Sequence, residues 1–423
     1  FTPTPLRNLS QHRFEPILVD ELRASLGTEL RYGHQWERSE EIGDHVLSEI
    51  TALDTGRTTR VRSRFVVGCD GAGSRVRKLL GIEMQGPPLI QCYLMIHFAA
   101  DLRELTADRP AVLHFVLDPA AGGVFIAHDV DSDWVFMHAI DPSVESVADY
   151  GDDRCLDVVN AAAGTALDAK ILGTGTWWMS SQTAESMGGG RIFLAGDAAH
   201  RFPPTGGLGL NSGVQDAHNL AWKLCAVEDG WAGPEVLDTY ATERLAVARE
   251  NTQQSLKNAL KMVLLPQALG TVEEPTSARL AASLADAERL PAIAAAVEEQ
   301  AEHFDMLGLQ LGYVYEEGAL VPDGSDGPAS STREYVPSAK PGARLPHAWI
   351  DDQGTSILDR IDLDGLTLLS FGSHQDWQAA VEAAQGAPLH QVRVGVDANL
   401  PEEWKASCGV DSTGALLVRP DQH

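Results

Sequence analysis

Basic residues are scarce in this chain. Its 423 residues include 32 lysines and arginines against 60 aspartates and glutamates, which gives a formal net charge of −28 and a pI near 4.7. Because so negative a surface repels polyanions, we expect neither nucleic acid nor an anionic membrane surface as a partner. The acidity favours solubility and carries no information about the substrate.

Cysteines are few, and long apolar runs are lacking. The chain has five cysteines without CxxC or metal-ligand spacing, which predicts free thiols in a reducing compartment. No apolar run reaches the roughly 18 residues that a spanning helix needs, so we expect no membrane segment; the first residues, Phe-Thr-Pro, do not resemble a signal peptide. With 44% hydrophobic residues, the composition fits a cytoplasmic enzyme of two or three domains.

The segment 191–211, RIFLAGDAAHRFPPTGGLGLN, is the most informative part of the sequence. Its apolar start predicts a buried strand. Gly196-Asp197 ends that strand, and a loop rich in proline and glycine leads to a helix that we expect from Asn211 to Glu228, stopped at Gly230. Glycines permit close backbone approach, and a helix N-terminus favours negative charge, so this pattern is typical of a site for a flat or phosphorylated ligand. The helix is expected to bury an apolar face made of Val214, Ala217, Leu220, Ala221 and Leu224.

A second turn of this kind follows the apolar run 65–68. It reads CDGAGSRVR, from Cys69 to Arg77. The guanidinium of Arg77 offers a fork of donors that suits a phosphate or a carboxylate. Asp70 could hold that fork or cap the turn that follows.

Together these segments resemble two motifs of the single-component FAD-dependent aromatic hydroxylases, the group of the phenol and para-hydroxybenzoate hydroxylases. The resemblance implies an α/β FAD/NAD(P)-binding fold of the para-hydroxybenzoate hydroxylase type, with an antiparallel-sheet substrate domain. It implies that Asp197 binds a ribityl or ribose hydroxyl of FAD, and that Asp70 and Arg77 brace a loop facing FAD and the nicotinamide cofactor. The further cofactor-binding residues that it implies are Gly196, Pro203, Gly206, Gly207, Leu208, Gly209, Leu210 and Asn211.

Two shorter stretches are also similar to the family. Gln11 stands where the family has a glutamine that touches the flavin, ahead of a helical run at 17–26; an ordinary helix start with Glu15 in its first turn explains the same residues equally well. The stretch 235–249 resembles a DTYxxER pattern through Asp238, Tyr240, Glu243 and Arg244.

The resemblance also implies the chemistry. NADPH or NADH reduces FAD, O2 adds at the flavin C4a position, and the hydroperoxide hydroxylates a phenolic or polycyclic aromatic substrate. Such an intermediate decays in water and needs an apolar cover, which strands expected at 91–99, 111–117, 122–128 and 134–139 can supply. Four histidines lie in this expected sheet: His97, His114, His128 and His138. Because any single histidine is more often structural than catalytic, we assign no catalytic base.

We expect the chain to begin with a partial FAD-binding domain at 1–89, which contains a hairpin over 46–53 and 60–67. A substrate-binding sheet domain follows at 90–185, and the rest of the FAD-binding domain with a helical region occupies 186–320. A linker at 321–343 then leads to a thioredoxin-like domain at 344–423. The β-α-β order of the last region resembles the C-terminal domain of the phenol-hydroxylase branch. Because it lacks a CxxC pair, we expect a redox-inactive domain that serves packing or a homodimer contact.

The strand–GxGxxG–helix element that binds the ADP half of FAD in this family does not occur in the sequence. Two alternatives therefore stay open. One is a truncated or split flavoprotein that is catalytically incomplete, and the other is a different flavin oxygenation on the same fold, such as epoxidation or a Baeyer–Villiger-type insertion. The identity of the substrate also stays open, from simple or chlorinated phenols to polycyclic polyketides.

Overall fold

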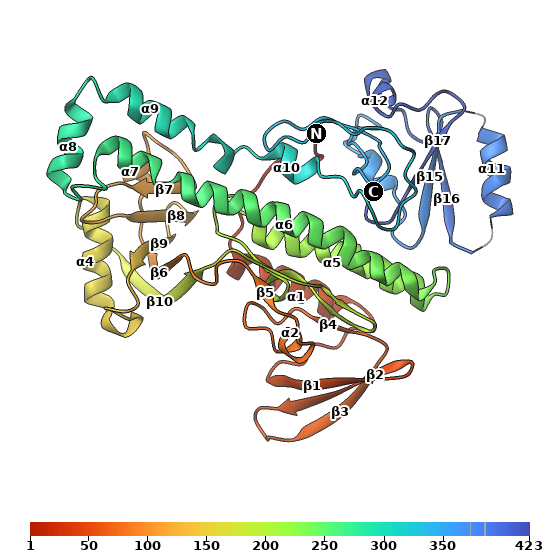
Figure 1. Cartoon of the computed structure of the whole chain (residues 1–423), viewed down its shortest axis with the longest axis horizontal. Coiled ribbons are helices and arrows are strands. Elements are labelled where there is room, and N and C mark those ends of the chain that lie inside the picture. Colours follow the sequence, from red (N-terminus) through yellow and green to blue (C-terminus); the bar gives the residue numbers. More distant parts are fainter. Residues whose placement is uncertain (373, 385) are drawn as a thin grey trace.

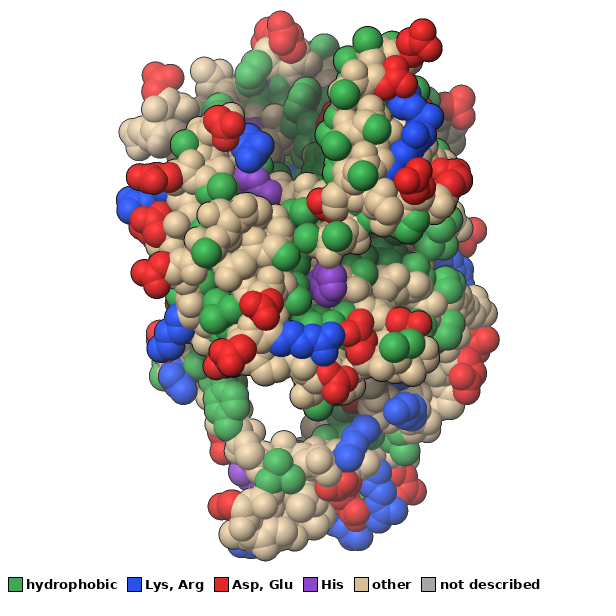
Figure 2. Space-filling model, turned by 90° about the vertical axis from the view of Figure 1, so that its left-hand side faces the viewer, with side chains coloured by type: hydrophobic (Ala, Val, Ile, Leu, Met, Phe, Trp, Pro, Cys, Tyr) green, Lys and Arg blue, Asp and Glu red, His purple; other side chains and the backbone are tan. Residues whose placement is uncertain are grey.

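The computed structural model describes residues 1–372, 374–384 and 386–423. The molecule is elongated (Figure 1). Two long helices that pack on each other, α5 (Leu208–Glu228) and α6 (Asp238–Lys261), run between an antiparallel sheet at one end and a C-terminal β-α-β unit at the other. Figure 2, seen from the side of the antiparallel sheet, shows acidic and basic side chains spread over the face and a hollow above the lowest part of the molecule.

The antiparallel sheet has five strands in the order β10-β6-β9-β8-β7. Along β6, the second strand in this order, alternate side chains are buried, and this buried face packs with helix α4 (Asp152–Ala163). The opposite face is free of α4 and carries the other set of side chains. The four strands expected from the sequence are all present, and the fifth, β10, runs over Lys170–Met179. Their bounds are β6 Gln91–Ala99, β7 Leu113–Val116, β8 Gly123–Asp129 and β9 Asp133–Ile140.

The sheet separates the four histidines into two pairs. His114 contacts the buried Trp134 and His138 stacks on Phe136, so these two lie on the α4 side. His97 and His128 lie on the other side, with their rings 6.3 Å apart. The sequence alone could not distinguish the pairs, because the pairing register between neighbouring strands decides which of their residues share a face.

A parallel strand pair positions the two motif turns. Strand β4 (Val66–Gly68) pairs with β13 (Ile192–Leu194), and β12 (Gly188–Gly189) adds an antiparallel third strand. Both β4 and β13 were expected from their apolar runs. Because the two strands are parallel, their carboxyl ends meet at one edge, where ligands bind in open α/β sheets.

Helix α5 differs from the expectation in its start and in its buried face. It begins at Leu208 and not at Asn211. Of the expected face, Leu220 is buried and Leu224 half-buried, whereas Val214, Ala217 and Ala221 are exposed. The apolar buried positions are Leu208, Leu220, Trp222 and Ala226. As many are polar, and these follow one another at a spacing of three or four residues: Ser212, Asp216, Asn219 and Lys223. Each of these four polar side chains makes hydrogen bonds or ion pairs to α6 or the C-terminal segment, so a hydrophobic pattern could not reveal the buried face. The predicted stop is confirmed, since Gly230 has a φ of 77°.

The N-terminal part consists of a helix and a three-stranded sheet. Helix α1 (Gln11–Ala24) begins six residues before the expected run and has no buried residue. Strands β2 (His45–Ala52) and β3 (Thr58–Ser63) form the expected hairpin, and β1 (His34–Ile42) adds an outer strand that sequence reasoning missed. Most residues of β1 are polar and exposed, so it lacks the alternation that marks a strand.

The remaining elements complete the scaffold. The C-terminal unit has the strand order β16-β15-β17, with β15 and β16 parallel and β17 antiparallel. No helix within the described ranges is both long and apolar enough to cross a membrane. The other bounds are α2 Arg75–Leu79, β5 Met84–Gln85, α3 Arg103–Thr106, β11 Gln182–Ala184, β14 His200–Arg201, α7 Leu264–Leu269, α8 Ser277–Ala285, α9 Leu290–Glu298, α10 Leu307–Leu311, β15 Leu366–Ser370, α11 His374–Ala383, β16 Leu389–Arg393, α12 Glu402–Ser407 and β17 Ala415–Val418.

Candidate active site

Arg77 joins the two motif turns. It is 5% exposed, its Nη1 donates to the carbonyl of Ala198 at 2.7 Å, and its Nη2 donates to the carbonyl of Ala72 at 3.1 Å. Ala198 belongs to the turn after β13, and Ala72 to the turn after β4. The guanidinium fork therefore fixes one turn against the other.

Asp70 caps helix α2 and does not bind Arg77. Its carboxylate accepts hydrogen bonds from the Ser74 hydroxyl at 2.5 Å and from the backbone amides of Arg75 and Val76 at 2.7 and 3.2 Å. Burial opposes the charged form, but these hydrogen bonds hold the pKa of Asp70 below its usual value. Of the two roles open from the sequence, the structure shows the cap.

Asp216 is a buried anchor that sequence reasoning missed. One carboxylate oxygen accepts the amide of Gly196 at 3.1 Å and lies 2.6 Å from His200 Nε2; the other accepts from Arg244 Nε at 2.8 Å. The Asp216 side chain is fully buried. Burial opposes ionisation, yet His200 and Arg244 lower the pKa of Asp216. A buried, charged network of Asp216, His200 and Arg244 therefore fixes the position of the turn that begins at Gly196.

The DTYxxER stretch supplies much of this support. Tyr240 Oη donates to the carbonyl of Leu194, the last residue of β13, at 2.7 Å. Arg244 pairs with Asp216, whereas Glu243 faces the C-terminal segment and pairs with Arg419 at 2.9 Å. The family resemblance was the only signal in the sequence for these contacts, because each partner lies far away along the chain.

The turn presents an open surface at the start of α5. Gly196 lies against Gly213, where an added Cβ on Gly213 would come within 3.4 Å of the Gly196 Cα, so turn and helix pack backbone to backbone. Gly207, with a φ of 65°, precedes the helix and has no side chain with which to cap it. The first turn of α5 contains no acidic residue, and the Asn211 amide folds back onto the Gly207 carbonyl at 2.8 Å.

This surface suits FAD. Atoms added at Gly207 and Gly209 would meet nothing within 4 Å, so a flat ring could approach the backbone there. The helix N-terminus favours the negative charge of a phosphate or a reduced flavin. Asp197 is exposed beside it and offers an acceptor for ligand hydroxyls. The glycine surface therefore matches the flat ring of FAD, the helix N-terminus matches its negative charge, and the carboxylate of Asp197 matches its hydroxyl groups.

The other predicted cofactor contacts differ in environment. Leu210 is 62% exposed, whereas Pro203 is buried and Leu208 packs in a small core with Phe202. Leu208 can therefore contribute only its backbone to a ligand. Gln11 begins α1 and its amide donates to Glu15; among the described contacts none connects it to the two turns.

Two protein families match the chain. The FAD binding domain family covers residues 1–255, and the family described as aromatic-ring hydroxylase, C-terminal, covers residues 338–423. The chain belongs to the FAD-dependent aromatic-ring hydroxylases. It is therefore a flavoprotein monooxygenase with FAD as cofactor and NAD(P)H as the reductant general to the family. The recognition, fold class and cofactors predicted from the two motifs are confirmed.

Relatives of this hydroxylase are named for different compounds. It is 32% identical to the tetracenomycin A2 monooxygenase-dioxygenase of Streptomyces glaucescens, over 99% of this chain and 72% of the relative. It is 30% identical to the 2,4-dichlorophenol 6-monooxygenase of Delftia acidovorans, over 99% and 76%. Among solved structures, the flavin-dependent monooxygenase PieE in complex with FAD and substrate matches with a TM-score of 0.90 and 34% identity, over 100% of this chain and 77% of PieE.

The face of the five-stranded sheet away from α4 gives this hydroxylase an apolar surface. Tyr93 and Trp177 pair across β6 and β10 with ring centroids 6.1 Å apart. Met95 and Met137 pair across β6 and β9, and Val135 pairs with Ile126. The surface ends at His97, where polar side chains begin.

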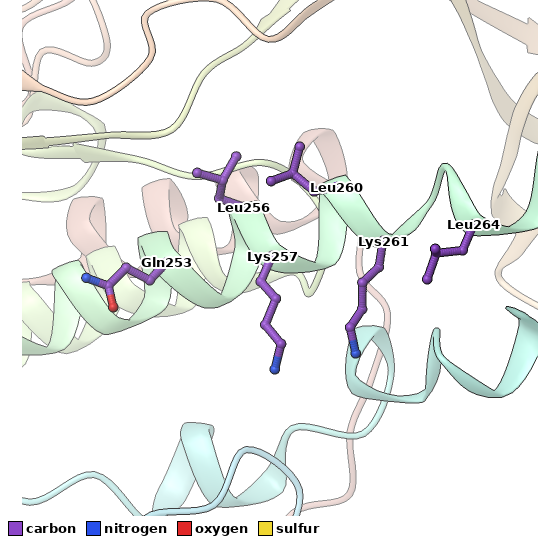
Figure 3. Close-up of a pocket in the computed structure, with 6 residues that line it drawn as sticks. All are labelled: Gln253, Leu256, Lys257, Leu260, Lys261 and Leu264. Atoms are coloured by element: carbon purple, nitrogen blue, oxygen red, sulfur yellow. The ribbon is translucent and has the colours of Figure 1, made fainter. Parts of the chain in front are cut away.

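A separate groove of about 480 Å³ runs along the end of α6 (Figure 3). In Figure 3 Leu256 and Leu260 point to one side of the helix, and Lys257 and Lys261 point to the other. Lys257 and Lys261 pair with Glu302, Lys257 at 2.8 Å. With its charged groups neutralised, the groove offers no reactive group, and we assign it no part in the chemistry. Its lining residues are Gln253, Leu256, Lys257, Leu260, Lys261 and Leu264.

Proposed function

We propose that the two joined turns hold FAD for the hydroxylation of a phenolic aromatic compound. The single observation that supports the residue assignment is the bridge by Arg77 between the turns at the carboxyl ends of two parallel strands. In this proposal Asp197 binds a hydroxyl of FAD, and the backbone of 206–211 faces the flavin ring. Asp70 and Arg77 act by shaping the turns, and Gln11 is a further contact from α1.

The chain's own groups have defined tasks. When bound, FAD accepts hydride from NAD(P)H and activates O2 so that one oxygen atom is transferred to the aromatic ring. The N-terminus of α5 stabilises negative charge on the bound cofactor. The apolar face around Tyr93 and Met137 excludes water from the reacting groups. No catalytic base is part of the proposal.

We propose a substrate class that extends to polycyclic phenols. The relatives are named for a polycyclic compound, tetracenomycin A2, and for a dichlorophenol. Aromatic side chains on the sheet face, such as Tyr93 and Trp177, suit stacking on extended rings. Substrate-stimulated oxidation of NAD(P)H by the FAD-loaded chain should therefore be stronger with a three- or four-ring phenol than with phenol itself; a preference for the single ring would contradict this assignment.

The remaining parts keep the roles expected from the sequence as proposals. The proposed domain boundaries lie after residues 89, 185, 320 and 343. The proposed location of the protein is the cytoplasm. Residues 344–423 form a redox-inactive unit that supports packing or a homodimer. Burial raises the pKa of Cys408 to about 12, which keeps this thiol protonated and unreactive.

Replacing Asp197 tests the cofactor assignment. Hydrogen bonds to charged groups contribute about 1.5–3 kcal/mol, so Asp197→Ala should weaken FAD binding by about tenfold to a hundredfold at about 1.4 kcal/mol per factor of ten. Visible flavin absorbance retained after desalting, and titration of apoprotein with FAD, measure this loss.

Asp229→Ala is the matched control for that variant, because Asp229 is an exposed acid at the opposite end of α5. This control should bind FAD as the unmodified chain does, and both variants should melt at the unmodified temperature. Equal FAD affinity in Asp197→Ala and Asp229→Ala would remove Asp197 from the site.

A further inference from the structure

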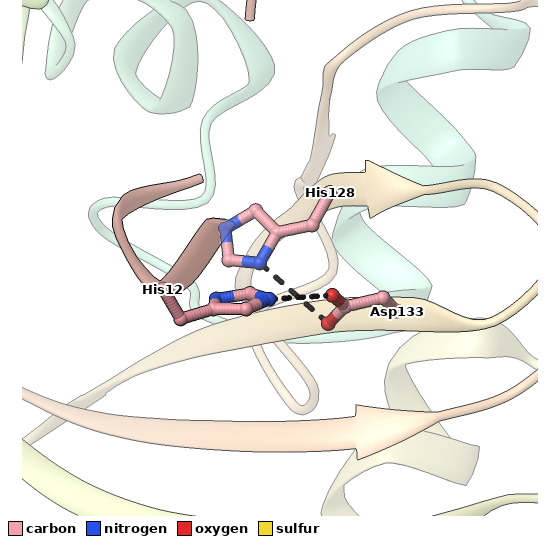
Figure 4. Close-up of side chains that lie close together, drawn as sticks. All are labelled: His12, His128 and Asp133. Atoms are coloured by element: carbon pink, nitrogen blue, oxygen red, sulfur yellow. Dashed lines mark hydrogen bonds and ion pairs between the residues drawn. The ribbon is translucent and has the colours of Figure 1, made fainter. Parts of the chain in front are cut away.

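A polar cluster lies at one end of the apolar sheet face and brings together residues from four elements. His12 comes from α1, His97 from β6, His128 from β8 and Asp133 from β9. Figure 4 shows His12 and His128 turned toward the carboxylate of Asp133. Neither the motifs nor the FAD assignment explains why three imidazoles gather around one carboxylate.

The distances in this cluster match the spacing of metal ligands. His12 Nε2 lies 3.0 Å from Asp133 Oδ2, and His128 Nδ1 lies 3.6 Å from Asp133 Oδ1. The ligand atoms of the three residues are all within 4.8 Å of one another. Ligands of a tetrahedral zinc ion, at bond lengths near 2.0–2.1 Å, are separated by about 3.3 Å. Small side-chain rotations would therefore close the three around one ion.

His128 supplies the second observation. Its Nδ1 is buried and makes no hydrogen bond within the part of the chain that the structure describes. A buried nitrogen without a partner is costly unless another group satisfies it. The side chains of His128 and Asp133 are only 19% and 11% exposed.

His97 occupies the place of an outer partner. Its Nε2 lies 2.7 Å from Asp133 Oδ1, so it orients the carboxylate while leaving the three-residue set intact. Metal-ligating carboxylates are commonly held in this way by a second hydrogen bond. Arg13 also reaches Asp133, at 3.6 Å, but it lies closer to Asp129, at 3.3 Å, and is 44% exposed, so it can turn away.

We propose that His12, His128 and Asp133 bind one divalent transition-metal ion of the zinc class. Two imidazoles and one carboxylate form a ligand set that suits Zn²⁺, with a position left for water. The ion would fasten α1 to the β8–β9 hairpin, next to the existing hydrogen bond from Asn8 to the carbonyl of Ala127. Because His12 follows Gln11, the ion also fixes the start of the segment that we propose as a flavin contact. The metal site itself does not depend on that assignment.

Titration of the untagged, chelator-treated full chain with Zn²⁺ tests the site. Calorimetry should show saturable binding of one ion per chain, and Co²⁺ should give the visible absorption of a bound, low-symmetry site. His12→Ala and His128→Ala should each lose this binding. His97→Ala should weaken it by about tenfold to a hundredfold, as expected for an outer partner.

His114→Ala is the matched control, because it removes a histidine from the opposite face of the same sheet. It should bind Zn²⁺ as the unmodified chain does. Far-ultraviolet circular dichroism confirms that the variants are folded, and Zn²⁺ should raise the melting temperature of the unmodified chain but not of His128→Ala. The proposal is overturned if the unmodified chain shows no saturable one-to-one binding, or if the double variant His12→Ala/His128→Ala binds as tightly.

Discussion

Asp216→Asn should lower the free energy of unfolding by about 3–5 kcal/mol, the usual cost of breaking a buried ion pair. The substitution keeps the size of the side chain but removes its charge, so Arg244 remains buried without its carboxylate partner. It also weakens the acceptor for the Gly196 amide and the partner of His200. Differential scanning calorimetry should show a melting transition lower by on the order of 10 °C.

The same variant should lose FAD, because the turn at Gly196 is no longer held in place. Asp197→Ala is the control, since Asp197 is exposed in that same turn and should lose affinity for FAD while keeping its melting temperature. The two effects are thus separable: Asp197 acts on the ligand, and Asp216 acts on the turn. If Asp216→Asn melts as the unmodified chain does and retains FAD, the buried network does not position the turn.

Arg419→Ala should lower the free energy of unfolding by a similar amount, and it should destabilise mainly the C-terminal region. Arg419 Nη1 and Nη2 each lie 2.9 Å from a carboxylate oxygen of Glu243, and Nη2 lies 2.6 Å from Asp421 Oδ2. Glu243 and Asp421 are buried, so without Arg419 their charge is left facing Lys223, Asn219 and the backbone amide of Ala319. We expect a loss of about 3–5 kcal/mol.

Limited proteolysis shows which part of the chain loses stability in Arg419→Ala. Because this network connects the last residues of the chain to α5 and α6, Arg419→Ala should be cleaved faster within the segment 321–343. The matched control is Arg393→Ala, whose exposed pair with Asp397 lies in the same C-terminal unit. An exposed pair contributes about 0–1 kcal/mol, so this control should resist the protease as the unmodified chain does. Equal cleavage of both variants would show that the buried network does not hold the C-terminal segment.

Much of the local structure could be predicted from the sequence. Apolar runs such as 65–68 and alternation such as that of 91–99 marked strands that the structure contains. The glycine after α5 marked its end. These signals work because burial imposes a period of two on strands, and because a positive φ selects glycine at helix ends. Strand β1 escaped prediction because its exposed, polar residues carry no such period.

The buried face of α5 could not be predicted in the same way. Asp216, Asn219 and Lys223 look like surface residues in a sequence, since isolated charges are rarely buried. They are buried here because residues on other elements pair with them. Arg244 of α6 pairs with Asp216, Glu243 of α6 pairs with Lys223, and Asn219 donates to Glu243 and to Asp421 near the end of the chain. Pairing of this kind depends on tertiary contacts between residues that are 20 or more positions apart in the chain.

The sequence by itself determined the family, the cofactor and the positions of the two motif turns, because those depend on short strings whose backbone requirements are local. Only the tertiary structure decided that Arg77 joins the turns, that Asp70 is a helix cap, and that Asp216 holds Gly196 from below. It alone separated His97 and His128 from the other two sheet histidines and brought them to His12 and Asp133. The physical reason is that hydrogen bonds and metal ligation depend on distances in space, which strand pairing and helix packing set between residues far apart in the chain.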